Sequence, residues 1–211
     1  MFVGKAVILR WVVVGLVVAG AMTWGYQIIT STRVESHLPV YGEHEEDGTE
    51  HKIKDFSLIN QDGRTVTQDN FNDKIYVADF FFANCEGICP IMSNQLMRVD
   101  ERFKNNPEVL ILSHTVKPHE DSIPVLKRYA EEHEASSNWY FVTGDVREIN
   151  ELAKNSYLVG ATEGDTDEDF VHTQFFTLID PQKRIRGFYD GTDSTEVSRL
   201  IDDIGKLVAE Y

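Results

Sequence analysis

The two cysteines of this sequence, Cys85 and Cys89, stand four positions apart and are its most reactive side chains. An apolar and aromatic run over 75–82 precedes them and predicts a strand buried on both faces. Apolar residues at helical spacing over 91–103 follow and predict a helix. The cysteines therefore lie at a strand-to-helix corner, where the helix N-terminus favours thiolate over thiol. Because four positions make about one helical turn, the sulfurs can converge, either to form a disulfide or to share a soft metal ion.

A third candidate, His172, follows the acidic segment 163–169 and precedes a predicted strand over 175–180. Functional groups concentrate where strands meet loops. Two thiolates and an imidazole suit Cu(I), which is soft and accepts low coordination, whereas Zn(II) normally takes a fourth ligand. The spacing alone leaves a second interpretation open, because a lone histidine before a strand is more often structural or simply exposed.

The remaining histidines and methionines are expected to have ordinary roles. His114 ends a predicted buried strand and His119 lies in a polar loop, so we interpret them as structural or solvated. Met92 and Met97 follow Cys89 on the predicted helix, where core packing is the expected use, although a thioether near Cu(I) is chemically feasible. Three histidines of the polar N-terminal segment are expected to be solvated: His37, His44 and His51.

Strands and helices alternate around the cysteine corner. The sequence predicts a β-hairpin over 55–67 and then further strands and helices in the order given by these ranges: strand 109–113, a helix from 124, strand 139–142, a helix from 149, strands 175–180 and 185–189, and helix 196–208. This order predicts an α/β fold, a thioredoxin-like mixed sheet flanked by helices, with an N-terminal hairpin.

An uncharged apolar run from Trp11 to Ile29 precedes the predicted domain. As a helix it would be about 28 Å long, close to the thickness of the hydrocarbon core. Lys5 and Arg10 precede it, so the positive-inside rule places the N-terminus in the cytoplasm and the domain outside. The alternative is a cleaved signal peptide ending near Ala21, but the apolar run continues past that point, which favours an uncleaved single-pass anchor.

The predicted organisation is therefore a membrane anchor over 1–30, a polar linker over 31–52 and one domain over 53–211. The net charge is −15, and such an acidic chain is a poor binder of nucleic acid or of anionic lipid through charge. The cysteine pair faces a compartment in which disulfides persist.

The motifs at the two candidate sites resemble those of the Sco/SenC family of copper chaperones. The resemblance rests on Cys85–Pro90 after Asp79–Phe82, and on His172 and Thr173 before Phe176–Pro181. It covers about residues 53–208 and extends to the single N-terminal anchor. Further agreement is found in Ser113–Pro118, Asp121–Ser122, Trp139–Gly144 and Gly187–Gly191.

The resemblance implies a membrane-tethered, thioredoxin-like protein that binds copper through Cys85, Cys89 and His172. Copper would be bound chiefly as Cu(I), with Cu(II) as a second state to consider. The implied partner is the copper-receiving subunit of cytochrome c oxidase or another cuproprotein. Such proteins assist assembly of the copper centre by delivering copper, by reducing the target's cysteines, or both. An assembly factor is thus expected more than an enzyme, held by one helix in the bacterial inner membrane with its domain on the periplasmic side.

Two positions depart from the family's pattern. Many members have an acidic residue where this chain has Gly87, and an aspartate where it has Lys117. Neither position is a metal ligand in the family's site. The departures therefore bear on partner recognition and redox tuning and leave the expectation of copper binding unchanged.

Three other functions compete with this interpretation. A thiol-disulfide oxidoreductase would use Cys85 and Cys89 as its redox-active pair and keep target cysteines reduced, but thioredoxin-type enzymes have two residues between their cysteines and a proline where His172 and Thr173 stand. A peroxidase would need Thr or Ser and Pro shortly before the reactive cysteine, where this chain has Phe81–Asn84. A purely structural disulfide would leave His172 without a role.

Overall fold

The computed structural model describes residues 11, 14–16, 18–24, 38–42, 48–160 and 173–211. The chain divides into two units, residues 1–35 with 209–211, and residues 36–208. In the first unit the described residues between 11 and 24 are helical and exposed. Among the described residues, no helix is both long and apolar enough to cross a membrane. The N-terminal anchor stays a prediction.

The second unit is built on one seven-stranded mixed sheet, which confirms the predicted α/β architecture. Its strand order is β2-β1-β5-β4-β3-β6-β7. The three central strands β3, β4 and β5 run parallel, and the remaining pairs are antiparallel. The strands are β1 (Ser57–Asn60), β2 (Thr65–Thr67), β3 (Ile75–Phe81), β4 (Val109–Thr115), β5 (Trp139–Thr143), β6 (Phe175–Ile179) and β7 (Ile185–Asp190).

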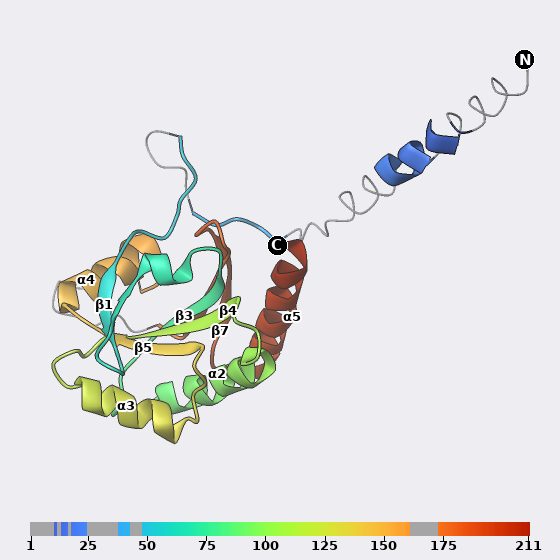
Figure 1. The fold of residues 1–211 in the computed structure, drawn as a ribbon. Coiled ribbons are helices and arrows are strands. Elements are labelled where there is room, and N and C mark those ends of the chain that lie inside the picture. The colour runs from blue at the N-terminus through green and yellow to red at the C-terminus, as the bar shows by residue number, and fades with distance from the viewer. Residues whose placement is uncertain (1–10, 12–13, 17, 25–37, 43–47, 161–172) are drawn as a thin grey trace, which may run out of the picture. The chain divides into compact units, whose positions relative to one another are not determined.

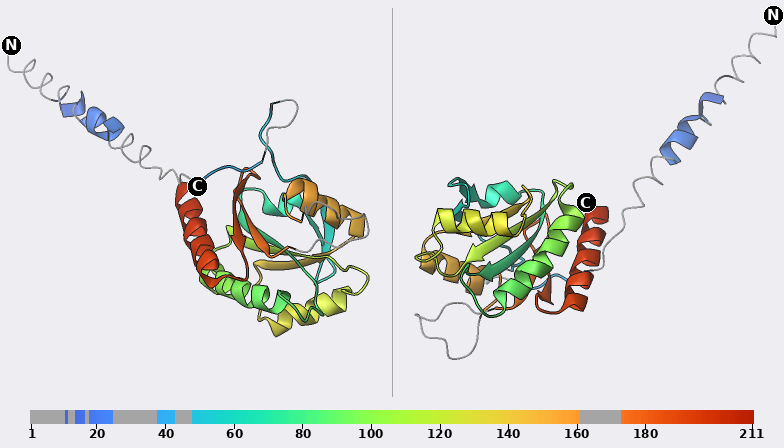
Figure 2. Two further views of the ribbon diagram at one scale, coloured as in Figure 1. Left: turned by 180° about the vertical axis from the view of Figure 1, so that it is seen from behind. Right: turned by 90° about the horizontal axis from the view of Figure 1, so that it is seen from below.

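Helices cover both faces of the sheet, as Figures 1 and 2 show. One face is covered by α2 (Cys89–Phe103), α3 (Ile123–Glu132) and α5 (Ser194–Glu210). The other face is covered by the short 3-10 helix η1 (Gln68–Phe71), by α4 (Val146–Glu151) and by its π-helical continuation η2 (Leu152–Ser156). The sequence did not predict η1 or the π-helical turn.

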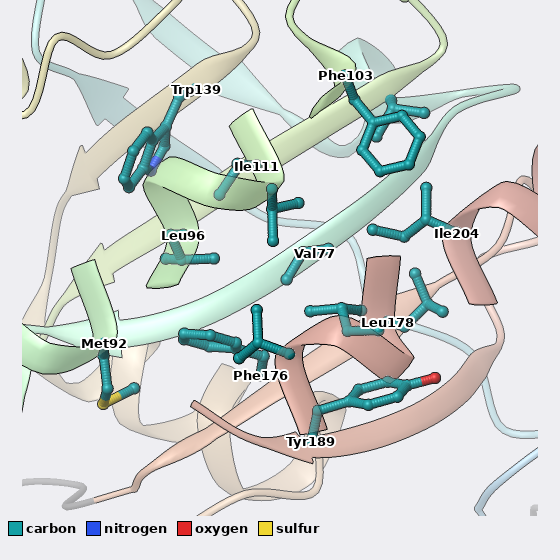
Figure 3. Close-up of a cluster of buried hydrophobic side chains, with 14 of the residues drawn as sticks. Val77, Met92, Leu96, Phe103, Ile111, Trp139, Phe176, Leu178, Tyr189 and Ile204 are labelled. Atoms are coloured by element: carbon teal, nitrogen blue, oxygen red, sulfur yellow. The ribbon is translucent and has the colours of Figure 1, made fainter. Parts of the chain in front are cut away.

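The larger core lies between the sheet and α2, α3 and α5 (Figure 3). Val77 and Ile111 of the parallel strands contribute to it, as do Leu96 of α2 and Ile204 of α5. All four are almost fully buried. Because β3 and β4 are buried on both faces, they carry continuous apolar runs in place of an alternating pattern.

The predicted hairpin at the start of the domain is confirmed, and its turn is stabilised by Asn60. The Asn60 side-chain oxygen accepts hydrogen bonds from the amides of Asp62 (3.1 Å) and Arg64 (2.9 Å). Gly63 has a φ of 73°, a backbone conformation that glycine adopts without steric cost. This local turn explains why the hairpin could be recognised from sequence.

The segment expected to be a linker contacts the domain in part. The expectation that His51 is solvated is wrong, since its side chain is buried and its Nε2 lies 2.8 Å from the carbonyl oxygen of Ser156. Tyr41 forms an isolated bridge with Ile185 of β7. The guanidinium of Arg186 donates to the carbonyl of Leu38 at 2.9 Å. Backbone and side-chain contacts thus attach Leu38 and Tyr41 to the edge strand β7, and His51 to η2.

Candidate metal centre

Cys85 and Cys89 lie where β3 leads into α2, as predicted. Cys89 is the first residue of α2 and is 6% exposed, whereas Cys85 is half-buried in the preceding loop. Pro90 occupies the first turn of α2, where no amide hydrogen is needed for the helix. The helix therefore starts at the second cysteine, and the first is left nearer the surface.

The two thiols are not bonded to each other, and hydrogen bonds converge on the sulfur of Cys85. Burial by itself raises the pKa of Cys85, but hydrogen bonds from the Cys89 thiol and from the amides of Cys89, Gly87 and Ile88 outweigh it. The pKa of Cys85 is therefore lowered. Cys85 is thus the more acidic thiol of the pair, and it is also the more exposed of the two sulfurs.

Cys89 has the opposite character. Burial raises its pKa to about 12, and its hydrogen bond to Cys85 and the charges of Cys85 and Asp79 act in the same direction. In the metal-free protein Cys89 thus keeps its proton and donates it toward Cys85. A soft cation between the two sulfurs would have to displace that proton.

A buried carboxyl group, Asp79, lies beneath the cysteines in the middle of β3. Its side chain accepts a hydrogen bond from the Ser113 hydroxyl, which in turn accepts one from Trp139 Nε1 at 2.8 Å. Burial raises the pKa of Asp79 to about 7. Our sequence interpretation missed this residue, although an acid inside an otherwise apolar strand is an anomaly that could have indicated it.

The structure places the other candidate residues as follows. His172 lies outside the described residues, so its role as a ligand stays a prediction. Within the described ranges, no group of three or more Cys, His, Asp or Glu side chains could hold a metal ion. Met92 is buried in the core and Met97 packs against it, as expected. His119 is exposed, and His114 is fully buried on the opposite face of the sheet.

A mixed sheet with a cysteine pair between one of its inner parallel strands, β3, and the following helix defines a thioredoxin-like protein with a C-x-x-x-C site. The model of the SCO1/SenC family matches residues 44–209. The chain belongs to the SCO1/SenC family.

Individual relatives agree with this assignment. The chain is 30% identical to a SCO1 protein homolog of Bacillus subtilis over 166 residues, which are 77% of this chain and 86% of that protein. It is 32% identical to BsSco, with a TM-score of 0.63 over 74% of this chain and 93% of that one. BsSco has a disulfide switch and is a member of the Sco family of cytochrome c oxidase assembly proteins. Arabidopsis thaliana ScoI, solved with copper bound, is 27% identical, with a TM-score of 0.60 over 75% of this chain and 99% of that one.

Proposed function

We propose that this protein is a membrane-tethered copper chaperone that assists assembly of the copper centre of cytochrome c oxidase. The observation that carries the proposal is the convergence of Cys85 and Cys89, whose sulfurs share a hydrogen bond at the start of α2. Once Cys89 gives up its proton, the pair offers two thiolates within reach of one ion, which matches the preference of Cu(I) for soft ligands. Copper in the related Arabidopsis structure and family membership support the same cargo.

His172 is proposed as the third ligand. It lies just before Thr173 and β6, and β6 pairs with β3, the strand that ends before Cys85. A ligand entering from this neighbouring strand would complete a three-coordinate site that leaves room for a partner's thiolate. The apolar run 11–29 and the positive charges before it support a single-pass anchor in the bacterial inner membrane, with the domain on the periplasmic side.

Loading and transfer follow from the different pKa values of the two cysteines. Cu(I) would meet the Cys85 thiolate first, and binding to Cys89 then releases the proton that this buried thiol holds. Delivery to a cuproprotein proceeds by ligand exchange, in which a thiolate of the partner replaces Cys85 and then Cys89. When the pair is oxidised to a disulfide it has no thiolate to offer, so the redox state controls whether copper is held.

The proposal is tested by anaerobic Cu(I) titration of the reduced full-length protein in mild detergent against a competing chelator. We expect tight one-to-one binding that is lost in Cys85→Ala and weakened in His172→Ala. Unchanged affinity in the His172 variant would refute the three-ligand site. Absence of tight binding in the unmodified protein would refute the copper function itself.

A second function, thiol-disulfide exchange, is favoured by the same asymmetry of the cysteines. The Cys85 thiolate attacks a target disulfide and forms a mixed disulfide, and the target's other sulfur leaves as a thiolate. Cys89 passes its proton to that thiolate and attacks Cys85, which releases the reduced target and leaves a Cys85–Cys89 disulfide. Rapid reduction of a test disulfide by a protein that binds Cu(I) weakly would favour this function over copper delivery.

A further inference from the structure

The loop that carries Cys85 is attached to the rest of the domain by a buried carboxylate from another part of the chain. Asp121 is 1% exposed, and its Oδ2 accepts a hydrogen bond from the amide of Ala83 at 3.1 Å. The same oxygen accepts a hydrogen bond from the hydroxyl of Thr115, at the end of β4. One oxygen therefore joins the end of β4 to the residue two positions before Cys85.

The position of Asp121 at first indicates a helix cap, but its contacts do not. The cap residue of α3 is Ser122, and the side chain of Ser122 makes no capping hydrogen bond. The carboxylate of Asp121 points away from the helix, toward Thr115 and Ala83. Its contacts thus serve the cysteine loop.

Neighbouring bonds make the connection stiff. The amide of Lys117 donates to Thr115 Oγ1 at 3.0 Å, and the amide of Asp121 donates to the carbonyl of Lys117 at 2.9 Å. The ammonium group of Lys117 lies 4.3 Å from the centre of the Phe82 ring, a cation–π contact on the residue next to Ala83. The amide of Cys85 then donates to the carbonyl of Phe82 at 3.3 Å. An unbroken series of contacts leads from Asp121 to Cys85.

We infer that Asp121 is a positioning residue, which holds the Phe82–Cys85 loop so that the Cys85 sulfur is preorganised against Cys89. This inference rests on the proposed copper function. Copper binding to a loop that is already in place needs no further ordering, whereas a loosened loop is binding-competent for only a fraction of the time, and the apparent affinity falls by that fraction. Asp121 does not itself bind the metal.

The test compares four variants. Asp121→Ala removes both bonds, whereas Thr115→Val keeps the Ala83 bond and removes the hydroxyl bond to Asp121 together with the acceptor of the Lys117 amide. Asp121→Asn keeps a carbonyl oxygen that can accept both bonds, since both go to one oxygen, and burial raises the pKa of Asp121, so a neutral amide suits the site. The matched control is Asp100→Ala, because Asp100 is also buried and also accepts from one amide (3.0 Å) and one hydroxyl (2.5 Å), both of Ser136.

We expect Asp121→Ala to weaken Cu(I) binding about tenfold, the equivalent of ~1.4 kcal/mol. Asp121→Asn should restore the affinity to within about twofold, and Thr115→Val should lie between the two. Asp100→Ala should lower the unfolding temperature as much as Asp121→Ala and leave copper affinity unchanged. Equal copper affinity in Asp121→Ala and Asp100→Ala, or no rescue by Asn, would overturn the inference. If Asp121→Ala does not fold, the comparison of Thr115→Val with Asp100→Ala decides.

A readout without copper separates this inference from the proposed function. The reaction of the reduced protein with iodoacetamide at neutral pH reports on the Cys85 thiolate, which is favoured only while the Cys85 sulfur is held against the amides of Gly87, Ile88 and Cys89. We expect a rate about threefold to tenfold lower in Asp121→Ala and normal in Asp121→Asn. If the unmodified protein fails to bind Cu(I) but this pattern appears, the copper function is wrong and the positioning role stands. A normal rate in Asp121→Ala contradicts the positioning role.

Discussion

Two adjacent residue pairs of the β3–β4 ladder place different chemistry on the opposite faces of the sheet. Asp79 pairs with Ser113, and the next residues along, Phe80 and His114, form the neighbouring pair of the β3–β4 ladder. Because successive strand residues point to opposite faces, the first pair faces α2 and the cysteines, and the second faces the core under η1 and α4.

The side chains of the two pairs are bound differently. Asp79 has a polar partner in Ser113, and its charge adds to the burial that raises the pKa of Cys89. The ring of His114 stacks on Phe80 with centroids 4.7 Å apart, and its Nε2 has no hydrogen-bond partner among the residues that the structure describes. Burial lowers the pKa of His114 to about 4, so it is neutral. One step in register thus decides which titratable side chain can influence the cysteine site.

The largest expected effect separates the two faces directly. Cys89→Ala should lower Cu(I) affinity by on the order of a thousandfold. The binding free energy of a structural zinc site is about 10–16 kcal/mol, and if a copper site is similar, each of a few ligands contributes several kcal/mol. His114→Leu should leave the affinity unchanged, because the imidazole lies across the sheet. Competition titration with a Cu(I) chelator measures both. A loss of affinity in His114→Leu would show that the two faces are not independent.

The pH dependence of stability should have opposite signs on the two faces. The pKa of Asp79 in the folded protein is about 7, above its ordinary value of 3.8. The stability that the protonated Asp79 contributes is therefore complete below pH 3.8 and is lost as pH rises through 7. The pKa of His114 is lowered from 6.5 to about 4, so the stability that neutral His114 contributes is present above pH 6.5 and is lost as pH falls through 4. Asp79→Asn keeps an acceptor for Ser113 and cannot ionise. It should be more stable than the unmodified protein at pH 8, with the difference shrinking toward pH 4, as urea unfolding would measure. An equal difference at both pH values would contradict a raised pKa at Asp79.

A smaller effect on stability should distinguish a buried hydroxyl that has hydrogen-bond partners from one that has none among the described residues. Ser113→Ala leaves Trp139 Nε1 without its buried acceptor and Asp79 without its donor, and should lower the free energy of unfolding by about 1–3 kcal/mol. Thr177 on β6 has a buried Oγ1 with no partner in the described part of the chain. Thr177→Val should therefore be neutral or stabilising by chemical denaturation. Destabilisation by Thr177→Val would indicate a hydrogen bond there.

The smallest effect concerns the loop between the cysteines. A Cβ at Gly87 would lie 3.7 Å from the Cys85 sulfur, an ordinary contact, so the position accepts a side chain. Gly87→Asp places a negative charge beside the thiolate and should raise the pKa of Cys85 by less than about one unit. The pH dependence of alkylation measures this, with Gly87→Ala as the uncharged control. A shift of the same size in Gly87→Ala would assign it to backbone change.

The sequence predicted what local patterns encode. The hairpin at Asn60, the buried strands and the start of α2 at the cysteine corner are confirmed because turn residues and apolar periodicity act over a few positions. The core position of Met92 followed from the same patterns, and of the two interpretations offered for His114, structural or solvated, the structure supports the structural one.

The parts that were missed depend on contacts distant in sequence. Asp121 meets Ala83 38 positions away, and no local pattern distinguishes that bond from a helix cap. His51 looks solvated in a polar segment, but η2 supplies a carbonyl more than a hundred positions later. Asp79 was identifiable as an anomaly, but its partner Ser113 required the register of β3 and β4.

The contacts of residues 38–41 with β7 determine where the folded domain begins. Arg186 is 4% exposed and donates to the carbonyls of Leu38 and Pro39, while Tyr41 occupies the outer edge of β7 beside Ile185. A fragment starting at residue 53 would leave a buried guanidinium short of two acceptors and uncover backbone groups able to pair with another chain. A fragment that keeps these contacts therefore begins at or before Leu38, and fragments that begin nearer to the first hairpin should self-associate.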